Sequence, residues 1–112
     1  MRRGEIWTAA GGPDYTGKPR PVTIVQDDRF DTDSVTVCPF TTDPTEAPLF
    51  RLEIEATETN GLHEVSRLMV DKITTVSRQK LGAKVGTLND EDIVRLNRAM
   101  MVFLGIAATA GS

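Results

Sequence analysis

GKPRPVTIVQ, residues 17–26, places one arginine between two prolines, directly before an apolar run. A proline fixes its own φ, removes a backbone donor and pushes the residue before it toward an extended conformation. We therefore expect Arg20, which precedes Pro21, to have a stiff, extended backbone at the start of a strand over residues 21–26. A guanidinium mounted there is a planar fork of five donors that suits a phosphate or a carboxylate. The alternative is an ordinary surface arginine.

Length and charge limit the kinds of protein that this chain can be. It has 112 residues, a formal net charge of −3 and a pI of about 5.1. One domain over residues 1–112 is expected, small enough for pairing with a second copy to help its stability. Any polyanion site on such an acidic chain must be local.

The sequence lacks a cysteine pair and a long apolar segment, and these two absences predict the cellular compartment. Cys38 is the only cysteine, so no internal disulfide is possible and a reducing compartment fits. No apolar segment follows the basic start, and no run approaches the roughly 20 residues of a membrane span. We expect a soluble cytoplasmic protein that does not contact membranes.

Most of the chain has the residue types and alternation of short strands. Phe50, Leu52 and Ile54 share one face of a predicted strand, and charged residues occupy the other. Pro39 is expected where the third strand leaves its ladder or lies at an edge. Strands are expected over residues 5–10, 21–26, 34–40, 49–55, 66–70, 73–76 and 83–88, with a possible helical turn over 77–82.

One helix is predicted at the end of the chain. Asn89 can cap it, three acidic residues follow in its first turn, and Gly105 stops it. Its apolar stripe is expected to cover the sheet, and residues 107–112 read as a frayed, disordered tail. Short strands with one terminal helix predict a mainly β fold, as a small, strongly bent antiparallel sheet or barrel.

The chemistry open to these residues is narrow. His63 is the only histidine, and the sequence has no zinc-ligand spacing, no phosphate loop and no nucleophile elbow. We expect no metal and no cofactor. If the start of the second strand lies beside the end of the third, Arg20 and Thr41 are close, and both can bind a phosphate's non-bridging oxygens. That suffices for attack by an RNA 2′-hydroxyl on its own phosphodiester, a nucleophile that DNA lacks.

Short pieces of the sequence, in this order, resemble the MazF/PemK family of toxin endoribonucleases, the mRNA interferases of type II toxin–antitoxin systems. They are Arg3-Gly4-Glu5-Ile6-Trp7, Arg20-Pro21-Val22, Phe40-Thr41-Thr42, Asp71-Lys72-Ile73 and Phe103-Leu104-Gly105-Ile106. The resemblance implies an SH3-like β-barrel of the CcdB/PemK/MazF type with a C-terminal helix, and a homodimer. It also implies sequence-selective cleavage of single-stranded RNA to 2′,3′-cyclic phosphate and 5′-hydroxyl ends, and neutralisation by a cognate antitoxin.

By the same resemblance, Arg20 and Thr41 are the catalytic pair. Because an arginine pKa above about 12 makes deprotonation hard, we assign Arg20 to charge stabilisation and leave the proton acceptor open. The residues expected to hold the RNA are Lys18, Thr42, Lys72 and Arg78.

Two other readings remain open. The first is a CcdB-like toxin that inhibits DNA gyrase by binding, although Leu104-Gly105-Ile106-Ala107 lacks the tryptophan that CcdB presents at its helix end. The second is a non-catalytic member that only binds a partner, against which the presence of both Arg20 and Thr41 speaks.

Overall fold

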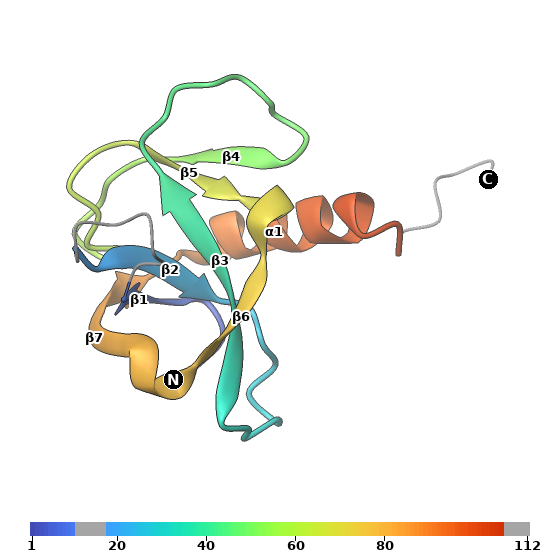
Figure 1. Cartoon of the computed structure of the whole chain (residues 1–112). Helices are drawn as coiled ribbons and strands as arrows, with labels where there is room; N and C mark the ends of the chain where they lie inside the picture. The colour runs from blue at the N-terminus through green and yellow to red at the C-terminus, as the bar shows by residue number, and fades with distance from the viewer. Residues whose placement is uncertain (11–17, 107–112) are drawn as a thin grey trace.

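The computed structural model describes residues 1–10 and 18–106; residues 11–17 and the expected tail over 107–112 lie outside the described part. The elements are β1 Glu5–Ala9, β2 Arg20–Ile24, β3 Ser34–Thr41, β4 Arg51–Ile54, β5 Ser66–Met69, the 3-10 turn η1 Val70–Lys72, β6 Thr74–Ser77, the 3-10 turn η2 Arg78–Lys80, β7 Leu81–Thr87 and α1 Asp90–Phe103. The prediction of a mainly β fold with a terminal helix is confirmed (Figure 1).

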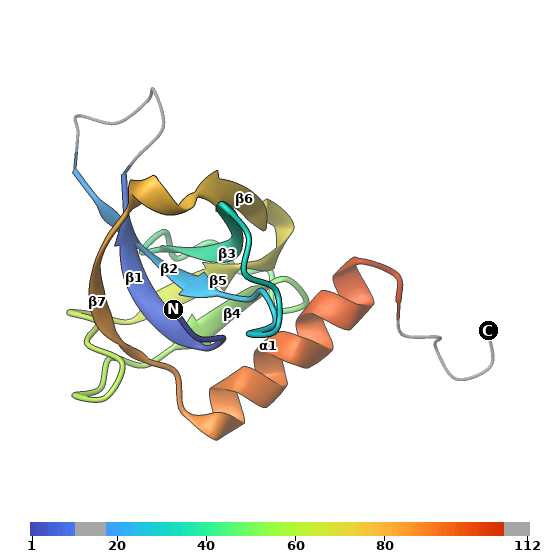
Figure 2. The same cartoon turned by 90° about the horizontal axis from the view of Figure 1, so that it is seen from below.

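The seven strands form one antiparallel sheet that bends strongly but does not close. Its path runs β4-β5-β3-β2-β1-β7, with β6 paired to β3 beside this path. The two ends of the path, β4 and β7, are not paired with each other, although the sheet curls round in Figure 2. The expected bent antiparallel sheet is therefore confirmed, whereas the closed barrel is not.

The central strand β3 changes partner at Pro39. Along one edge β3 pairs with β2, from Ile24↔Val37 to Val22↔Pro39. Along the other edge it pairs with β6 as far as Val37, and with β5 only from Phe40 onward. Pro39, which has no backbone N–H to donate, lies between these two partners. The far end of β3 thus leaves β6 and pairs with β5, which in turn pairs with β4.

The core lies on both faces of the central strands, because neighbouring residues on a strand point to opposite faces. Val35 and Val37 of β3 belong to one apolar cluster, which also contains residues of β1, β2 and β7. Cys38 and Phe40 belong to the other, which Leu96 of α1 covers. Burial raises the pKa of the Cys38 thiol to about 12. Cys38 is therefore the small core residue that the sequence predicted.

The terminal helix begins and ends where its signals predict. The side chain of Asn89 accepts a hydrogen bond from the backbone N–H of Asp92 at 2.8 Å. Gly105 follows the helix with φ of +70°, a conformation that glycine adopts at little cost. The helix packs against β4 and η1, with Leu96 and Ala99 buried.

Glu5 of β1 accepts three hydrogen bonds or ion pairs in a largely buried position. Its carboxylate oxygens lie 3.0 Å from the Trp7 indole nitrogen, 2.9 Å from the Arg2 backbone nitrogen and 3.1 Å from Lys84 Nζ of β7. Burial by itself raises the pKa of Glu5, but these partners together lower it to about 2. The carboxylate therefore stabilises the folded β1–β7 pair only while it is charged.

We predict that Glu5→Gln changes how stability depends on pH. A lowered pKa adds stability above the unfolded value of 4.5, and this is lost as the pH falls toward 2. The free energy of unfolding should therefore fall more steeply below pH 5 in the unsubstituted protein than in the variant, by at most about 3 kcal/mol in total. Urea titrations at pH 3 to 7 measure this, and parallel pH curves for the two proteins would contradict it.

Thr23 gives a second prediction about stability. Its side chain is fully buried in β2, between Ile6 of β1 and Cys38 of β3, and its hydroxyl has no hydrogen-bond partner among residues 1–10 and 18–106. An unpartnered buried hydroxyl costs about 1–3 kcal/mol. Thr23→Val replaces it with a methyl group of similar size, so we expect a gain of about 1 kcal/mol in the free energy of unfolding, with the urea m-value unchanged. Lower stability in the variant would contradict this prediction.

Candidate active site

Arg20 and Thr41 lie on the wall of one surface pocket. Arg20 is the first residue of β2, and Thr41 is the last residue of β3. The register Val22↔Pro39, extended by two residues, places them opposite each other on the same face. The pocket has a volume of about 290 Å³ and is lined by Lys18, Pro19, Arg20, Pro21, Phe40, Thr41, Thr42 and Ser66. Four of the six residues assigned to the site from the sequence therefore line this pocket.

The two side chains are held in different ways. Arg20 is exposed and follows Pro19 and precedes Pro21, so its backbone is stiff at the pocket edge. Thr41 is half-buried, and its Oγ1 accepts a hydrogen bond from the backbone N–H of Asp43 at 3.1 Å. A hydroxyl that accepts one hydrogen bond still has its own proton to donate. The pocket thus presents a guanidinium and a hydroxyl donor to an anion.

Two further pockets adjoin this one and continue it on either side. One, of about 500 Å³, shares Arg20 and Phe40 with it and extends along β6 to Lys72 and Lys80. The other, of about 280 Å³, shares Pro19, Pro21, Thr42 and Ser66 with it and extends to Leu62, His63 and Glu64. We refer to the three together as the groove; Arg20 and Thr41 lie near its middle.

Lys72 lines the groove from η1, and an ion pair fixes the turn that carries it. Asp71, which precedes Lys72, accepts two hydrogen bonds from Arg51 of β4. The Nε–Oδ1 distance is 2.7 Å and the Nη2–Oδ2 distance is 2.9 Å. The hydrogen bonds from Arg51 are the main reason that the pKa of Asp71 lies below its usual value. A two-point, partly buried pair of this kind holds both geometry and charge. Asp71 thus holds the turn in place, and its neighbour Lys72 lines the groove.

The structure does not bring Arg78 to the groove. Arg78 lines a separate pocket with Met1 and three acidic residues of the loop after β2, Asp27, Asp28 and Asp31. Its guanidinium pairs with Asp31 at 3.6 Å and donates to the carbonyl of Thr32. These contacts tie η2 to the loop between β2 and β3, so the geometry gives the expected RNA contact of Arg78 no support.

Sequence reasoning left several groove residues unassigned. His63 and Glu64 come from the segment between β4 and β5, Ser66 is the first residue of β5, and Lys80 comes from η2. Lys80 lies in a basic stretch of the sequence, which was the only indication that it could contact RNA. The other three carried none, because nothing local indicates that this segment folds back beside the start of β2.

Sequence comparison finds relatives that match almost the whole chain. Residues 2–104 match the family described as "PemK-like, MazF-like toxin of type II toxin-antitoxin system". A relative from Mycolicibacterium smegmatis (strain ATCC 700084 / mc(2)155), named "Probable endoribonuclease MazF", is 62% identical over 108 residues, covering 96% of this chain and 99% of that protein.

Solved structures show the same fold. Mycobacterium tuberculosis toxin MazF-mt6 superposes with a TM-score of 0.77 at 25% identity, covering 93% of this chain and 99% of that chain. A MazE–MazF crystal structure (Form-III) from Deinococcus radiodurans superposes with a TM-score of 0.76 at 15% identity, covering 96% of this chain and 98% of that chain. The chain therefore belongs to the PemK-like, MazF-like family of toxins of type II toxin–antitoxin systems.

Proposed function

We propose that this toxin is an endoribonuclease that cleaves single-stranded RNA without a metal ion. The observation that carries the proposal is the pairing of Arg20 and Thr41 in one pocket near the middle of a longer groove. The relative from Mycolicibacterium smegmatis, at 62% identity, is itself named as a probable endoribonuclease. The alternative of gyrase binding gains no support from the groove, which suits an extended strand.

In the proposed reaction the RNA supplies its own nucleophile. The 2′-hydroxyl loses its proton as its oxygen attacks the adjacent phosphorus, the bond from phosphorus to the 5′-oxygen breaks, and the leaving 5′-oxygen takes up one proton, so no net proton is gained or lost. The products are a 2′,3′-cyclic phosphate and a 5′-hydroxyl. Negative charge grows on the non-bridging oxygens during the attack, and donors fixed in advance stabilise such charge most effectively. Arg20 supplies charge and two-point geometry, and Thr41 supplies a neutral donor.

We assign the rest of the groove to binding of the RNA strand. We assign Lys18, Lys72 and Thr42 to the RNA backbone near the reacting phosphate, and leave Arg78 out because it lies among acidic residues elsewhere. Single-stranded RNA is the expected substrate, because unstacked bases can enter hollows that a duplex cannot reach. Sequence selectivity would then come from the two outer parts of the groove.

The partners follow from the family. A solved endoribonuclease from mycobacterial species, 20% identical with a TM-score of 0.76, is in complex with its cognate antitoxin. We infer that this toxin likewise binds a cognate antitoxin, forms a homodimer and acts in the cytoplasm on mRNA. Large apolar side chains exposed at the end of α1, including Val102, Phe103 and Leu104, offer a surface for a protein contact. The described part of the chain contains no helix that could span a membrane.

Removing either catalytic group should slow cleavage. Arg20→Ala is expected to lower kcat by about 10²–10³-fold, since one lost oxyanion donor costs that much in other enzymes. Arg20→Lys keeps the charge but loses the forked pair of donors, so its kcat should lie between that of Arg20→Ala and that of the unsubstituted protein. Thr41→Val should lower kcat by about 10-fold or more. Cleavage of a defined single-stranded RNA in EDTA, with the ends mapped, measures all three.

Arg29→Ala is the matched control for these variants. Arg29 is an exposed arginine of the loop after β2, is paired with Asp27, and lies outside the groove lining. Its removal should leave cleavage unchanged. Full activity of Arg20→Ala, loss of all activity in EDTA, or 5′-phosphate ends would each refute the proposed reaction.

The salt dependence of RNA binding should separate Lys72 from Arg78. In a Thr41→Val background, Lys72→Gln removes a groove charge and should flatten the slope of log K against log salt by about 0.7, the value of one single-strand phosphate contact. Arg78→Gln removes an equal charge outside the groove and should leave the slope unchanged. Equal slopes for Lys72→Gln and its parent would remove Lys72 from the RNA path, and a flatter slope for Arg78→Gln would place Arg78 on it.

A further inference from the structure

Arg67 of β5 is the cross-strand neighbour of Thr41. The register pairs Thr41 with Arg67 on one side of β5, and Glu53 of β4 with Arg67 on the other. Residues directly opposite each other in an antiparallel pair project from the same face, with Cβ atoms about 5 Å apart. Thr41, Arg67 and Glu53 therefore form one row across three strands, opposite the face on which Phe40, Leu68 and Leu52 are buried.

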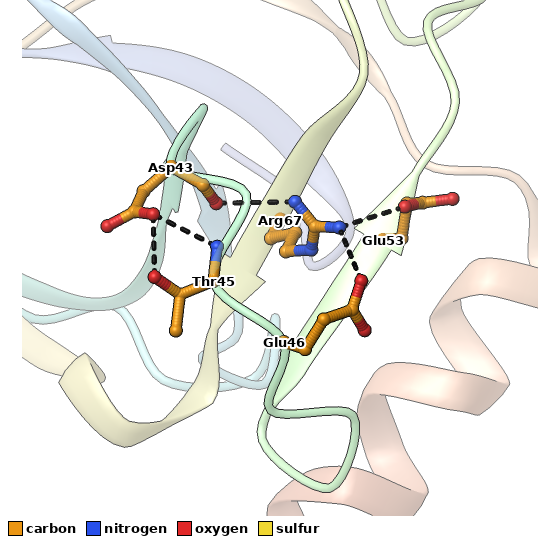
Figure 3. Close-up of polar contacts among 5 residues, drawn as sticks. All are labelled: Asp43, Thr45, Glu46, Glu53 and Arg67. Carbon is orange, nitrogen blue, oxygen red and sulfur yellow. Dashed lines mark hydrogen bonds and ion pairs between the residues drawn. The ribbon is translucent and has the colours of Figure 1, made fainter.

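The Arg67 guanidinium holds the loop that follows Thr41 (Figure 3). Its Nη1 donates to the backbone carbonyl of Asp43 at 3.3 Å, and its Nη2 lies 3.1 Å from Glu53 and 3.5 Å from Glu46. Only 12% of its side chain is exposed, although both carboxylate partners are largely open to solvent. A guanidinium in this setting is engaged by the protein and poorly placed to contact RNA.

Asp43 links this arginine to the hydroxyl of Thr41. The Asp43 carbonyl accepts from Arg67, while its backbone N–H donates to Thr41 Oγ1 at 3.1 Å. The Asp43 carboxylate accepts from the hydroxyl and the backbone N–H of Thr45, at 2.7 and 3.0 Å, and these bonds lower its pKa. The turn at Asp43 is thus fixed at its carbonyl and its side chain, and it presents its N–H to Thr41.

The hydrogen bond from the Asp43 N–H determines whether the Thr41 hydroxyl offers its proton or a lone pair to a substrate. A threonine hydroxyl has one proton and two lone pairs, and it rotates to suit its neighbours. With one lone pair facing the Asp43 N–H, the proton cannot point toward Asp43 and is available to an acceptor in the pocket. A donor held in this way needs no reorientation when charge develops on the phosphate.

We propose that Arg67 is a positioning residue for Thr41: it fixes the Asp43 turn so that Asp43 N–H orients the Thr41 hydroxyl as a donor to the reacting phosphate. The inference rests on the proposed function, because it assigns a purpose to the orientation of a catalytic hydroxyl. Arg67 itself touches neither the substrate nor the reacting atoms.

The first test is kinetic. Arg67→Met keeps the aliphatic stem and removes the guanidinium; it should lower kcat about 10-fold and change KM less than twofold, as expected when an interaction made only in the transition state is lost. Glu46→Gln is the matched control, because it alters an exposed partner of Arg67 and leaves the bond to the Asp43 carbonyl in place. Its kinetics should be unchanged. A higher KM at constant kcat in Arg67→Met would make Arg67 an RNA contact and overturn the proposal.

A double-mutant cycle tests whether Arg67 acts through Thr41. Residual cleavage is measured with enzyme in excess for Thr41→Val and for Thr41→Val combined with Arg67→Met. Once the hydroxyl is gone there is nothing to orient, so Arg67→Met should cause no further loss in that background. An equal loss in both backgrounds would show that Arg67 acts independently, and would overturn the proposal.

Hydrogen exchange at the Asp43 amide tests the positioning without using activity. Arg67→Met and Thr41→Val should each raise the exchange rate of this amide at least about 10-fold, whereas Glu46→Gln should not, and circular dichroism should show all three folded. An unchanged Asp43 rate in Arg67→Met would overturn the inference about Arg67. If the unsubstituted protein fails to cut RNA while the Asp43 amide responds as expected, the proposed function fails and the orientation by Arg67 stands.

Discussion

The partner change of β3 at Pro39 is the constraint on which the site depends. Up to Val37 the strand is hydrogen-bonded to β6, and from Phe40 it is hydrogen-bonded to β5. The same strand stays in register with β2 along its other edge, so its end remains opposite the start of β2. One strand therefore brings Thr41 both to Arg20, across the pocket, and to Arg67, across the ladder. If β3 continued beside β6, the second of these neighbours would be absent.

The prediction from sequence worked where the signal was local. Alternation around Leu52 and Ile54 located β4, and Asn89 with Gly105 located both ends of α1. Arg20 and Thr41 could be placed together because an antiparallel neighbour of β2 must end where β2 begins. Barrel closure could not be predicted, because it depends on whether β4 and β7, far apart in the sequence, happen to pair. Arg78 was assigned to RNA because nothing in its own neighbourhood reveals that acidic residues from another loop surround it.

A chain with a net charge of −3 can offer a site to a polyanion, because only the charges near that site act strongly on it. Two acidic residues next in sequence or across a strand from site residues have a basic partner: Asp71 pairs with Arg51, and Glu53 with Arg67. Such pairs add little to stability when they are exposed, but they cancel negative potential over a short range. Lys18, Lys72 and Lys80 line the groove itself. The potential that an RNA strand meets is therefore set by the groove and only weakly by the total charge.

The two catalytic groups need different kinds of preorganisation, and the fold supplies both. A guanidinium is charged in any orientation, so Arg20 needs chiefly a rigid mount, which the two prolines beside it provide. A hydroxyl is a weak, rotating donor whose value depends on where its proton points. Thr41 consequently requires a partner that occupies its lone pair, a turn that holds this partner, and a cation that holds the turn; Asp43 and Arg67 fill these roles. The contacts around Thr41 thus fix the direction of a weak donor, because geometry has to replace the charge that a hydroxyl lacks.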